Sequence, residues 1–235
     1  RLLNRPNWLT RSKARLKRVL LFTFRINTFP KPFRGIQSFI EPLKMWEIDN
    51  LGDHNFAHWD FSSESKATVA PFLESSKKIV LVPSAAWEMK RWPLPLWKKL
   101  ITIMPQQEFI ILGGKEDHFC EELKEVAPER VVNLAGKLSL VESCALIEKS
   151  PVVISADTGL LHVADVLGVN AISLMGPTAF GFTMGSQIIT LEVDLPCRPC
   201  TKDGRGRCSQ DVYQKCMVDI TPEKVAATAS KLLSK

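Results

Sequence analysis

Short apolar runs alternate with helical patterns from residue 78 to the end of the chain, and this alternation constrains the fold most. We expect strands at about residues 78–83, 107–112, 130–133, 152–155, 171–174 and 187–191, and helices at about 93–104, 117–126, 139–148, 158–168 and 221–234. Runs that are apolar throughout are typical of parallel strands covered on both faces. The pattern predicts an α/β fold with a doubly wound, Rossmann-like parallel sheet.

One strand-to-helix junction, residues 157–162, reads Asp157-Thr158-Gly159-Leu160-Leu161-His162. The first turn of a helix has free N–H groups and the positive end of the dipole, so it attracts anions such as phosphate. Gly159 allows close approach, Thr158 adds a hydroxyl, and His162 lies one turn further on. The alternative is an ordinary capping turn with Asp157 or Thr158 as N-cap, and a lone helical histidine that only packs.

A second junction follows the first predicted strand and carries Ser84, Lys90 and Arg91 before Pro93. Proline suits the first position of a helix, because its missing N–H would have no partner there. Lysine and arginine at this junction could meet a diphosphate, arginine with two oxygens at once. A solvated pair of charges is the alternative. Ligands of doubly wound sheets bind at the carboxyl ends of the strands, where both junctions lie.

Six segments occur in a fixed order: Lys90-Arg91-Trp92-Pro93, Gly113-Gly114-Lys115-Glu116-Asp117, Asn133-Leu134-Ala135-Gly136, residues 157–162, Gly176-Pro177-Thr178 and Ile220-Thr221-Pro222-Glu223. In order and spacing this set resembles the C-terminal half of the family 9 glycosyltransferases, the lipopolysaccharide heptosyltransferases. The resemblance covers about residues 78–235 and implies the GT-B type of fold. No single segment is specific to the family; the ordered set is.

The resemblance also implies roles for these residues in binding an ADP-sugar. Lys90 and Thr158-Gly159 would hold the diphosphate, with Ser84 at the same junction, and Asp117 would hold the ribose. Asp157 and His162 would line the end where the sugar meets the diphosphate.

By the same resemblance, the protein would transfer heptose, or a related sugar, from an ADP-sugar to a lipopolysaccharide core acceptor with inversion. It would work in the cytoplasm, peripheral to the inner membrane. No Asp-x-Asp motif is present, so we expect neither a metal nor another cofactor. The alternatives are a Rossmann-type oxidoreductase, disfavoured because no G-x-G-x-x-G follows a strand, and a non-catalytic nucleotide-binding or membrane-surface module.

The first part of the chain differs from the rest. We expect a strand at Val19–Phe24, a helix at Phe33–Ile48 with a possible kink at Pro42, and a linker at residues 62–77, leaving residues 1–61 as a remnant of an N-terminal acceptor-side domain. In the family, the proposed catalytic base lies in a glycine-rich loop of that domain. No residue here matches it, so the catalytic residue is unassigned and we expect the sequence to be a fragment.

Charge is distributed unevenly. Residues 1–34 hold ten Lys or Arg and no acidic residue, whereas the remaining 201 residues hold 21 basic and 25 acidic residues. Such a segment suits an anionic membrane surface or nucleic acid, and a solvated basic face is the alternative. We expect the membrane surface rather than nucleic acid. No apolar run reaches the roughly 18–20 residues of a membrane span.

Six cysteines are present, and four of them form the pattern Cys197-x2-Cys200-x7-Cys208-x7-Cys216. Four thiolates can bind zinc tetrahedrally, but only the first pair has the usual ligand spacing. Free thiols are the favoured interpretation, ahead of zinc and of a disulfide.

Overall fold

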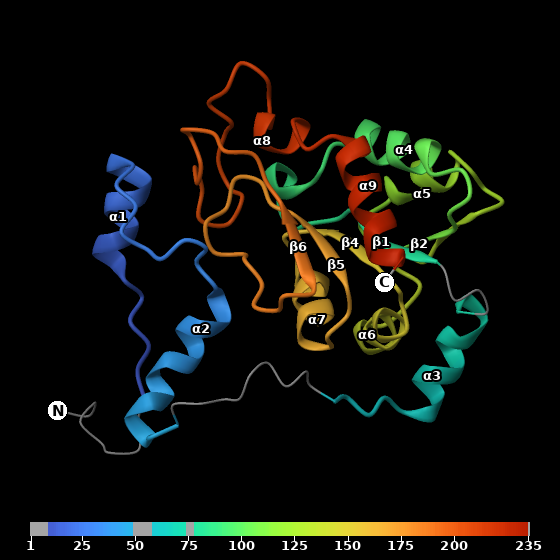
Figure 1. Ribbon diagram of the computed structural model, residues 1–235, viewed down its shortest axis with the longest axis horizontal. Helices are drawn as coiled ribbons and strands as arrows, with labels where there is room; N and C mark the ends of the chain where they lie inside the picture. The colour runs from blue at the N-terminus through green and yellow to red at the C-terminus, as the bar shows by residue number, and fades with distance from the viewer. Residues whose placement is uncertain (1–8, 49–57, 74–77, 235) are drawn as a thin grey trace.

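The computed structural model describes residues 9–48, 58–73 and 78–234. Its centre is a six-stranded, entirely parallel sheet with the order β3-β2-β1-β4-β5-β6 (Figure 1). The strands are β1 Ile79–Val82, β2 Phe109–Ile111, β3 Val131–Asn133, β4 Val153–Ala156, β5 Ala171–Leu174 and β6 Ile188–Leu191. The six predicted strands and the doubly wound α/β sheet are therefore confirmed.

Both faces of the sheet are covered, which explains why its strands are mostly apolar, although Asn133, Ser155 and Ser173 are buried polar residues within them. Helices α4 Leu94–Ile103, α5 Cys120–Lys124 and α9 Pro222–Leu233 cover one face, and α6 Leu140–Glu148 and α7 Gly159–Val166 cover the other (Figure 1). Alternate residues of β1 go to opposite cores, Leu81 to the first and Val80 to the second. Because side chains alternate between the two faces, a strand that is buried on both faces is apolar at most of its positions.

The strand order places a topological switch between β1 and β4. From β1 the chain moves outward to β2 and β3, and it then returns through α6 to place β4 on the other side of β1. Leu81 in β1 pairs with Ile111 of β2 on one side and with Ile154 of β4 on the other. Loops that leave the carboxyl ends of β1 and β4 therefore diverge and leave room for a ligand.

Local signals in the sequence set the ends of several helices. Ser139 and Glu142 form a capping box at the start of α6: the Glu142 N–H donates to the Ser139 hydroxyl, and the Ser139 N–H donates to the Glu142 carboxylate. These bonds hold the pKa of Glu142 below its usual value. The Thr221 hydroxyl caps α9 ahead of Pro222. Gly168, with a φ of 74°, ends α7.

The predicted strand at Val19–Phe24 is wrong, because these residues belong to helix α1, Arg15–Phe24. A strand needs a partner for its backbone groups, whereas a helix satisfies them within the segment. The helix predicted at Phe33–Ile48 is present as α2 Gly35–Ile40, which continues as the 3₁₀ helix η1 Glu41–Trp46. The change occurs beside Pro42, which cannot donate a helical hydrogen bond.

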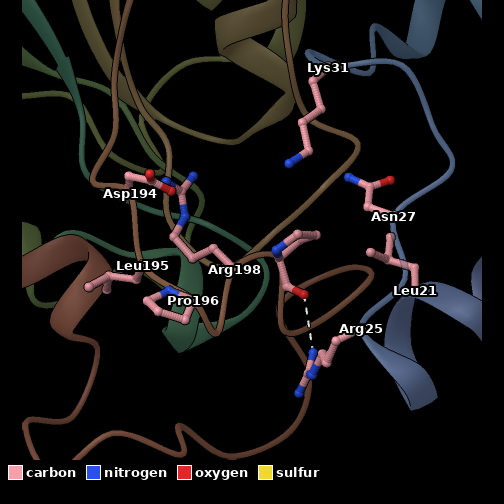
Figure 2. A pocket seen from close by; sticks show the side chains of 9 residues that line it. Leu21, Arg25, Asn27, Lys31, Asp194, Leu195, Pro196 and Arg198 are labelled. Carbon is pink, nitrogen blue, oxygen red and sulfur yellow. Dashed lines mark hydrogen bonds between the residues drawn. The ribbon is translucent and has the colours of Figure 1, made fainter.

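Aromatic side chains hold this N-terminal segment against the sheet domain. Phe22, Phe29 and Phe33 each make an edge-to-face contact with Phe180, which lies in the loop after β5. The Arg34 guanidinium donates to the Met184 carbonyl at 2.8 Å. The Arg25 guanidinium donates to the Pro199 carbonyl at 3.2 Å (Figure 2).

Part of the predicted linker packs on the sheet domain. Residues Ser63–Val69 form helix α3, capped by the Ser62 hydroxyl, and Ala70–Phe72 form the 3₁₀ turn η2. Phe61 and Val69 are buried in the core beneath α6 and α7. The last four residues of that linker, 74–77, lie outside the described residues. The division into domains at residues 61 and 77 remains a prediction.

Trp92 ties the start of α4 to the C-terminal region, and this contact predicts a stability difference. Its buried indole N–H donates to the carbonyls of Met217 and Ile220, each at 3.0 Å, and it packs edge-to-face on Trp97. The Trp97 N–H is also buried but has no hydrogen-bond partner in the described part of the chain. We expect Trp92→Phe to lower the free energy of unfolding by about 1–3 kcal/mol more than Trp97→Phe does, because only Trp92→Phe removes a hydrogen bond, the one that the indole N–H donates to the Ile220 carbonyl. The Met217 carbonyl keeps its hydrogen bond from the Ile220 N–H. Urea unfolding of both variants measures this, and equal losses would contradict it.

Candidate functional site

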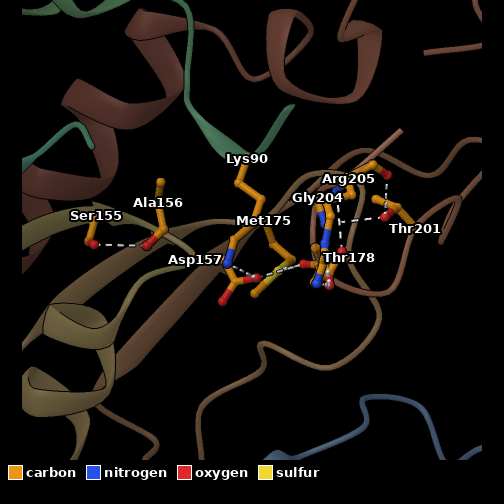
Figure 3. A network of polar contacts seen from close by, with 10 residues as sticks. Lys90, Ser155, Ala156, Asp157, Met175, Thr178, Thr201, Gly204 and Arg205 are labelled. Carbon is orange, nitrogen blue, oxygen red and sulfur yellow. Dashed lines mark hydrogen bonds and ion pairs between the residues drawn. The ribbon is translucent and has the colours of Figure 1, made fainter. Parts of the chain in front are cut away.

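The two predicted junctions meet in a buried ion pair. Lys90 ends the 3₁₀ turn η3, Glu88–Lys90, after β1, and Asp157 follows β4 directly. The Lys90 Nζ lies 3.1 Å from the Asp157 Oδ2, and their side chains are only 14% and 10% exposed (Figure 3). The strand order explains this meeting, because β1 and β4 are neighbours at the switch point.

Asp157 is held on several sides rather than acting as a helix cap. The Thr178 hydroxyl donates to its Oδ2 at 2.7 Å. Gly181 lies so close that a Cβ added there would be 2.3 Å from the carboxylate, so only glycine fits at this position. The N-cap of α7 is Thr158. The interpretation of Asp157 as a simple N-cap is therefore wrong.

The start of α7 presents polar atoms without partners. The Thr158 hydroxyl makes no capping hydrogen bond, and within the described residues neither this buried oxygen nor the buried Nδ1 of His162 has a partner. Gly159 is exposed, and a Cβ added there would meet nothing within 4 Å. The helix terminus therefore offers a hydroxyl and free N–H groups beside open space, as an anion site requires.

Asp117 has a clear local role. Its Oδ2 accepts a hydrogen bond from the Gly114 N–H at 2.7 Å, and its Oδ1 lies 3.7 Å from the Arg91 guanidinium. The Arg91 Nε donates to the Ala85 carbonyl at 2.9 Å, which fixes the guanidinium beside the loop after β1. Ser84, two residues after β1, is partly exposed. Asp117, Arg91 and Ser84 thus all belong to the edge where the β1 and β2 loops emerge.

A loop that sequence reasoning missed, residues 201–205, covers Lys90. Gly204 has a φ of 95° and packs on the Lys90 side chain, where an added Cβ would be 2.6 Å from Cγ. The Arg205 guanidinium lies over the Trp87 ring, 5.1 Å from its centroid. The Thr201 hydroxyl donates to the Arg205 carbonyl and closes the loop (Figure 3). The available signal was the basic, glycine-rich stretch after Cys200.

The four late cysteines are free thiols in one neighbourhood. Burial, together with the nearby Cys197 and Cys208, raises the pKa of Cys200, and burial raises the pKa of Cys216 to about 11. Within residues 9–48, 58–73 and 78–234, no group of three or more His, Cys, Asp or Glu side chains is arranged to hold a metal ion.

The chain is similar to proteins of one known family. The model of glycosyltransferase family 9 (heptosyltransferase) matches residues 47–209. The chain belongs to this family. The family resemblance and the fold predicted from it are confirmed, since solved heptosyltransferases share the parallel α/β architecture of the GT-B type.

The similar proteins include "Lipooligosaccharide heptosyltransferase 2" of Campylobacter jejuni, 30% identical over 68% of this chain and 53% of its own length. The structure of E. coli ADP-heptose lps heptosyltransferase II is similar at a TM-score of 0.60 and 23% identity, over 75% of this chain and 53% of that one. E. coli heptosyltransferase WaaC with ADP-2-deoxy-2-fluoro heptose has a TM-score of 0.53 and 17% identity, over 83% of this chain and 53% of that one. The chain spans about half the length of the curated relatives it matches.

The ion pair predicts a measurable coupling. Lys90→Met should lower the free energy of unfolding by about 3 kcal/mol, because it leaves the Asp157 carboxylate buried without a cation. In a double-mutant cycle with Asp157→Asn, we expect a coupling energy above about 1 kcal/mol. The exposed pair Lys99–Glu223 is the control, and Lys99→Met with Glu223→Gln should couple by less than about 1 kcal/mol. Equal coupling in both cycles would contradict the buried pair.

Burial of the thiols predicts an order of alkylation. Cys120 is fully buried, and burial raises the pKa of its thiol to about 12, so its thiolate is scarce near neutral pH. Iodoacetamide should modify the partly exposed Cys197 and Cys208 before Cys120 and Cys216 in the native protein. Mass spectrometry of timed samples measures the order, and early modification of Cys120 would contradict it. Unfolding the protein should remove the difference.

Proposed function

We propose that this chain provides the donor-binding part of an inverting glycosyltransferase that moves heptose, or a related sugar, from an ADP-sugar to a lipopolysaccharide core acceptor. Membership of family 9 and the heptosyltransferase names of its relatives support the proposal. In this proposal, Lys90, Thr158 and Gly159 bind the diphosphate and Asp117 binds the ribose. Ser84, Asp157 and His162 complete the donor site.

The unpartnered hydroxyl of Thr158 is the observation that carries the proposal. It is a buried polar oxygen at the start of α7, beside the open position of Gly159. A buried hydroxyl without a hydrogen bond costs free energy, so such a group in a native protein calls for a ligand or water. A phosphate oxygen would accept its hydrogen bond and those of the free N–H groups of the helix.

Lys90 contributes charge to the same ligand. Its ammonium has three donors, of which Asp157 takes one, so two remain for phosphate oxygens. During transfer the leaving ADP gains negative charge on its β-phosphate, and groups already aimed at that position stabilise it. Asp157 and Thr178 keep Lys90 in place, so no reorganisation is needed as the charge develops. Protein groups alone can thus hold the diphosphate, and we propose that no metal takes part.

The basic N-terminal segment supports a membrane-surface location for the acceptor reaction. Leu16, Val19, Phe24 and Ile26 are exposed apolar side chains of this segment, among the basic residues Arg15, Lys17 and Arg25. Apolar and basic side chains on one short segment suit the interface of an anionic membrane. Among the described residues, no helix has the length and apolarity to cross a bilayer.

Thr158→Val tests the donor site, because valine keeps the shape and removes the hydroxyl. We expect ADP affinity to fall roughly ten- to a hundredfold, since a hydrogen bond to a charged group contributes about 1.5–3 kcal/mol. Stability without ligand should not fall, because the hydroxyl has no partner within the described residues. Calorimetry with ADP, in buffer containing excess chelator, measures the affinity.

Thr102→Val is the matched control, since the Thr102 hydroxyl donates to the Lys98 carbonyl on α4, away from the junctions. Its ADP affinity should equal that of the unaltered protein. Unchanged binding by Thr158→Val would remove the hydroxyl from the site. Loss of all binding in chelator would contradict metal independence.

A further inference from the structure

A hollow of about 250 Å³ lies between the N-terminal segment and the loop after β6 (Figure 2). Neither Lys90 nor Asp157 lines it. Arg25, Asn27 and Lys31 line it from one side. The other side is lined by Asp194, Leu195, Pro196, Arg198 and Pro199. This volume lies below the usual range for drug-sized ligands and suits one sugar-sized group.

The cations of the N-terminal side have no carboxylate partner among the residues that the structure describes. Within the described ranges, neither Arg25 nor Lys31 takes part in a salt bridge. Arg25 gives one hydrogen bond to the Pro199 carbonyl, and Figure 2 shows the Lys31 ammonium and the Asn27 amide directed into the hollow. Two unmatched cations and an amide donor favour an anion.

Arg198 forms a fixed wall rather than a third free cation. It donates to the carbonyls of Gly176 and Val193 and to the Glu192 carboxylate. Its charge is therefore matched by Glu192, and its position is fixed relative to the loop after β5. Arg198, in the wall of the hollow, contacts Gly176, which lies two residues before Thr178. Thr178 in turn donates to Asp157, so a short stretch of chain joins the hollow to the candidate donor site.

Asp194 determines what kind of anion fits. A carboxylate in the wall opposes a purely anionic ligand, but it accepts hydrogen bonds from hydroxyl groups. A phosphate ester that also carries hydroxyls meets both requirements, with its phosphate at Arg25 and Lys31 and its hydroxyls toward Asp194. Inorganic phosphate would use only the basic side.

We infer that this hollow is a binding site for a phosphate ester that carries hydroxyl groups, on a sugar or on a lipid headgroup. That the hollow forms part of the acceptor region rests on the proposed function. That it binds a phosphate ester does not, because Arg25, Lys31 and Asp194 belong to neither predicted junction.

The test titrates glucose 1-phosphate into the protein with ADP at high concentration, so that the donor site is occupied. Saturable binding is expected, and Lys31→Glu should weaken it at least about tenfold through loss of a charge-assisted contact. Lys13→Glu is the control: it makes the same change of charge in the same basic segment, but Lys13 does not line the hollow. Circular dichroism and ADP affinity should be the same in both variants.

A short-chain phosphatidylglycerol, used below its micelle concentration, tests the lipid source. For either probe, a lower affinity in Lys31→Glu but not in Lys13→Glu supports the site. The probe that binds more tightly shows whether the natural ligand is a sugar phosphate or a lipid headgroup. The inference fails if neither probe binds saturably, or if both variants weaken binding equally, since that would indicate general attraction to the basic segment. It also fails if Lys31→Glu binds as the unaltered protein does. ADP binding is measured separately, so failure of the donor site is distinguished from failure here.

Discussion

The carboxylate of Asp157 is the point on which the rest of the candidate site depends. It is buried at the end of β4, and a charge in that position is tolerated only with a cation and hydrogen bonds around it. Lys90 arrives from the loop after β1, Thr178 from the loop after β5, and Gly181 lies against the carboxylate without a side chain. One buried charge thus fixes the relative positions of three loops at the carboxyl edge of the sheet.

Those parts of the fold that depend on local chemistry could be predicted from the sequence. Strands buried on both faces are apolar at most positions, so all six were identifiable despite polar residues such as Ser155 and Ser173. The Ser139–Glu142 capping box marks the start of α6. That Lys90 and Asp157 lie close together could also have been expected, since parallel strands end at one edge of the sheet. Their ion pair could not, because the sequence analysis assigned both side chains to a ligand rather than to each other.

The features that the sequence did not predict depend on contacts between parts of the chain that are distant in the sequence. Val19–Phe24 is apolar enough for either a strand or a helix, and the choice depends on whether another strand lies beside it. The loop at residues 201–205 reaches Lys90 from more than 100 positions away, and nothing local in either segment indicates the contact. The sequence offered Thr158 as a possible N-cap of α7, which it is, but does not reveal that its hydroxyl has no partner among the described residues.

The loop after β5 carries Phe180 and Gly181 side by side, and each residue has a different neighbour. Phe180 is the aromatic side chain on which the N-terminal segment rests, and Gly181 touches the carboxylate of Asp157. Rotation of this loop would therefore disturb both contacts at once. If a ligand binds more tightly when Asp157 is held in place, packing of the N-terminal segment must increase its affinity. By thermodynamic linkage, the ligand then strengthens that packing by the same factor.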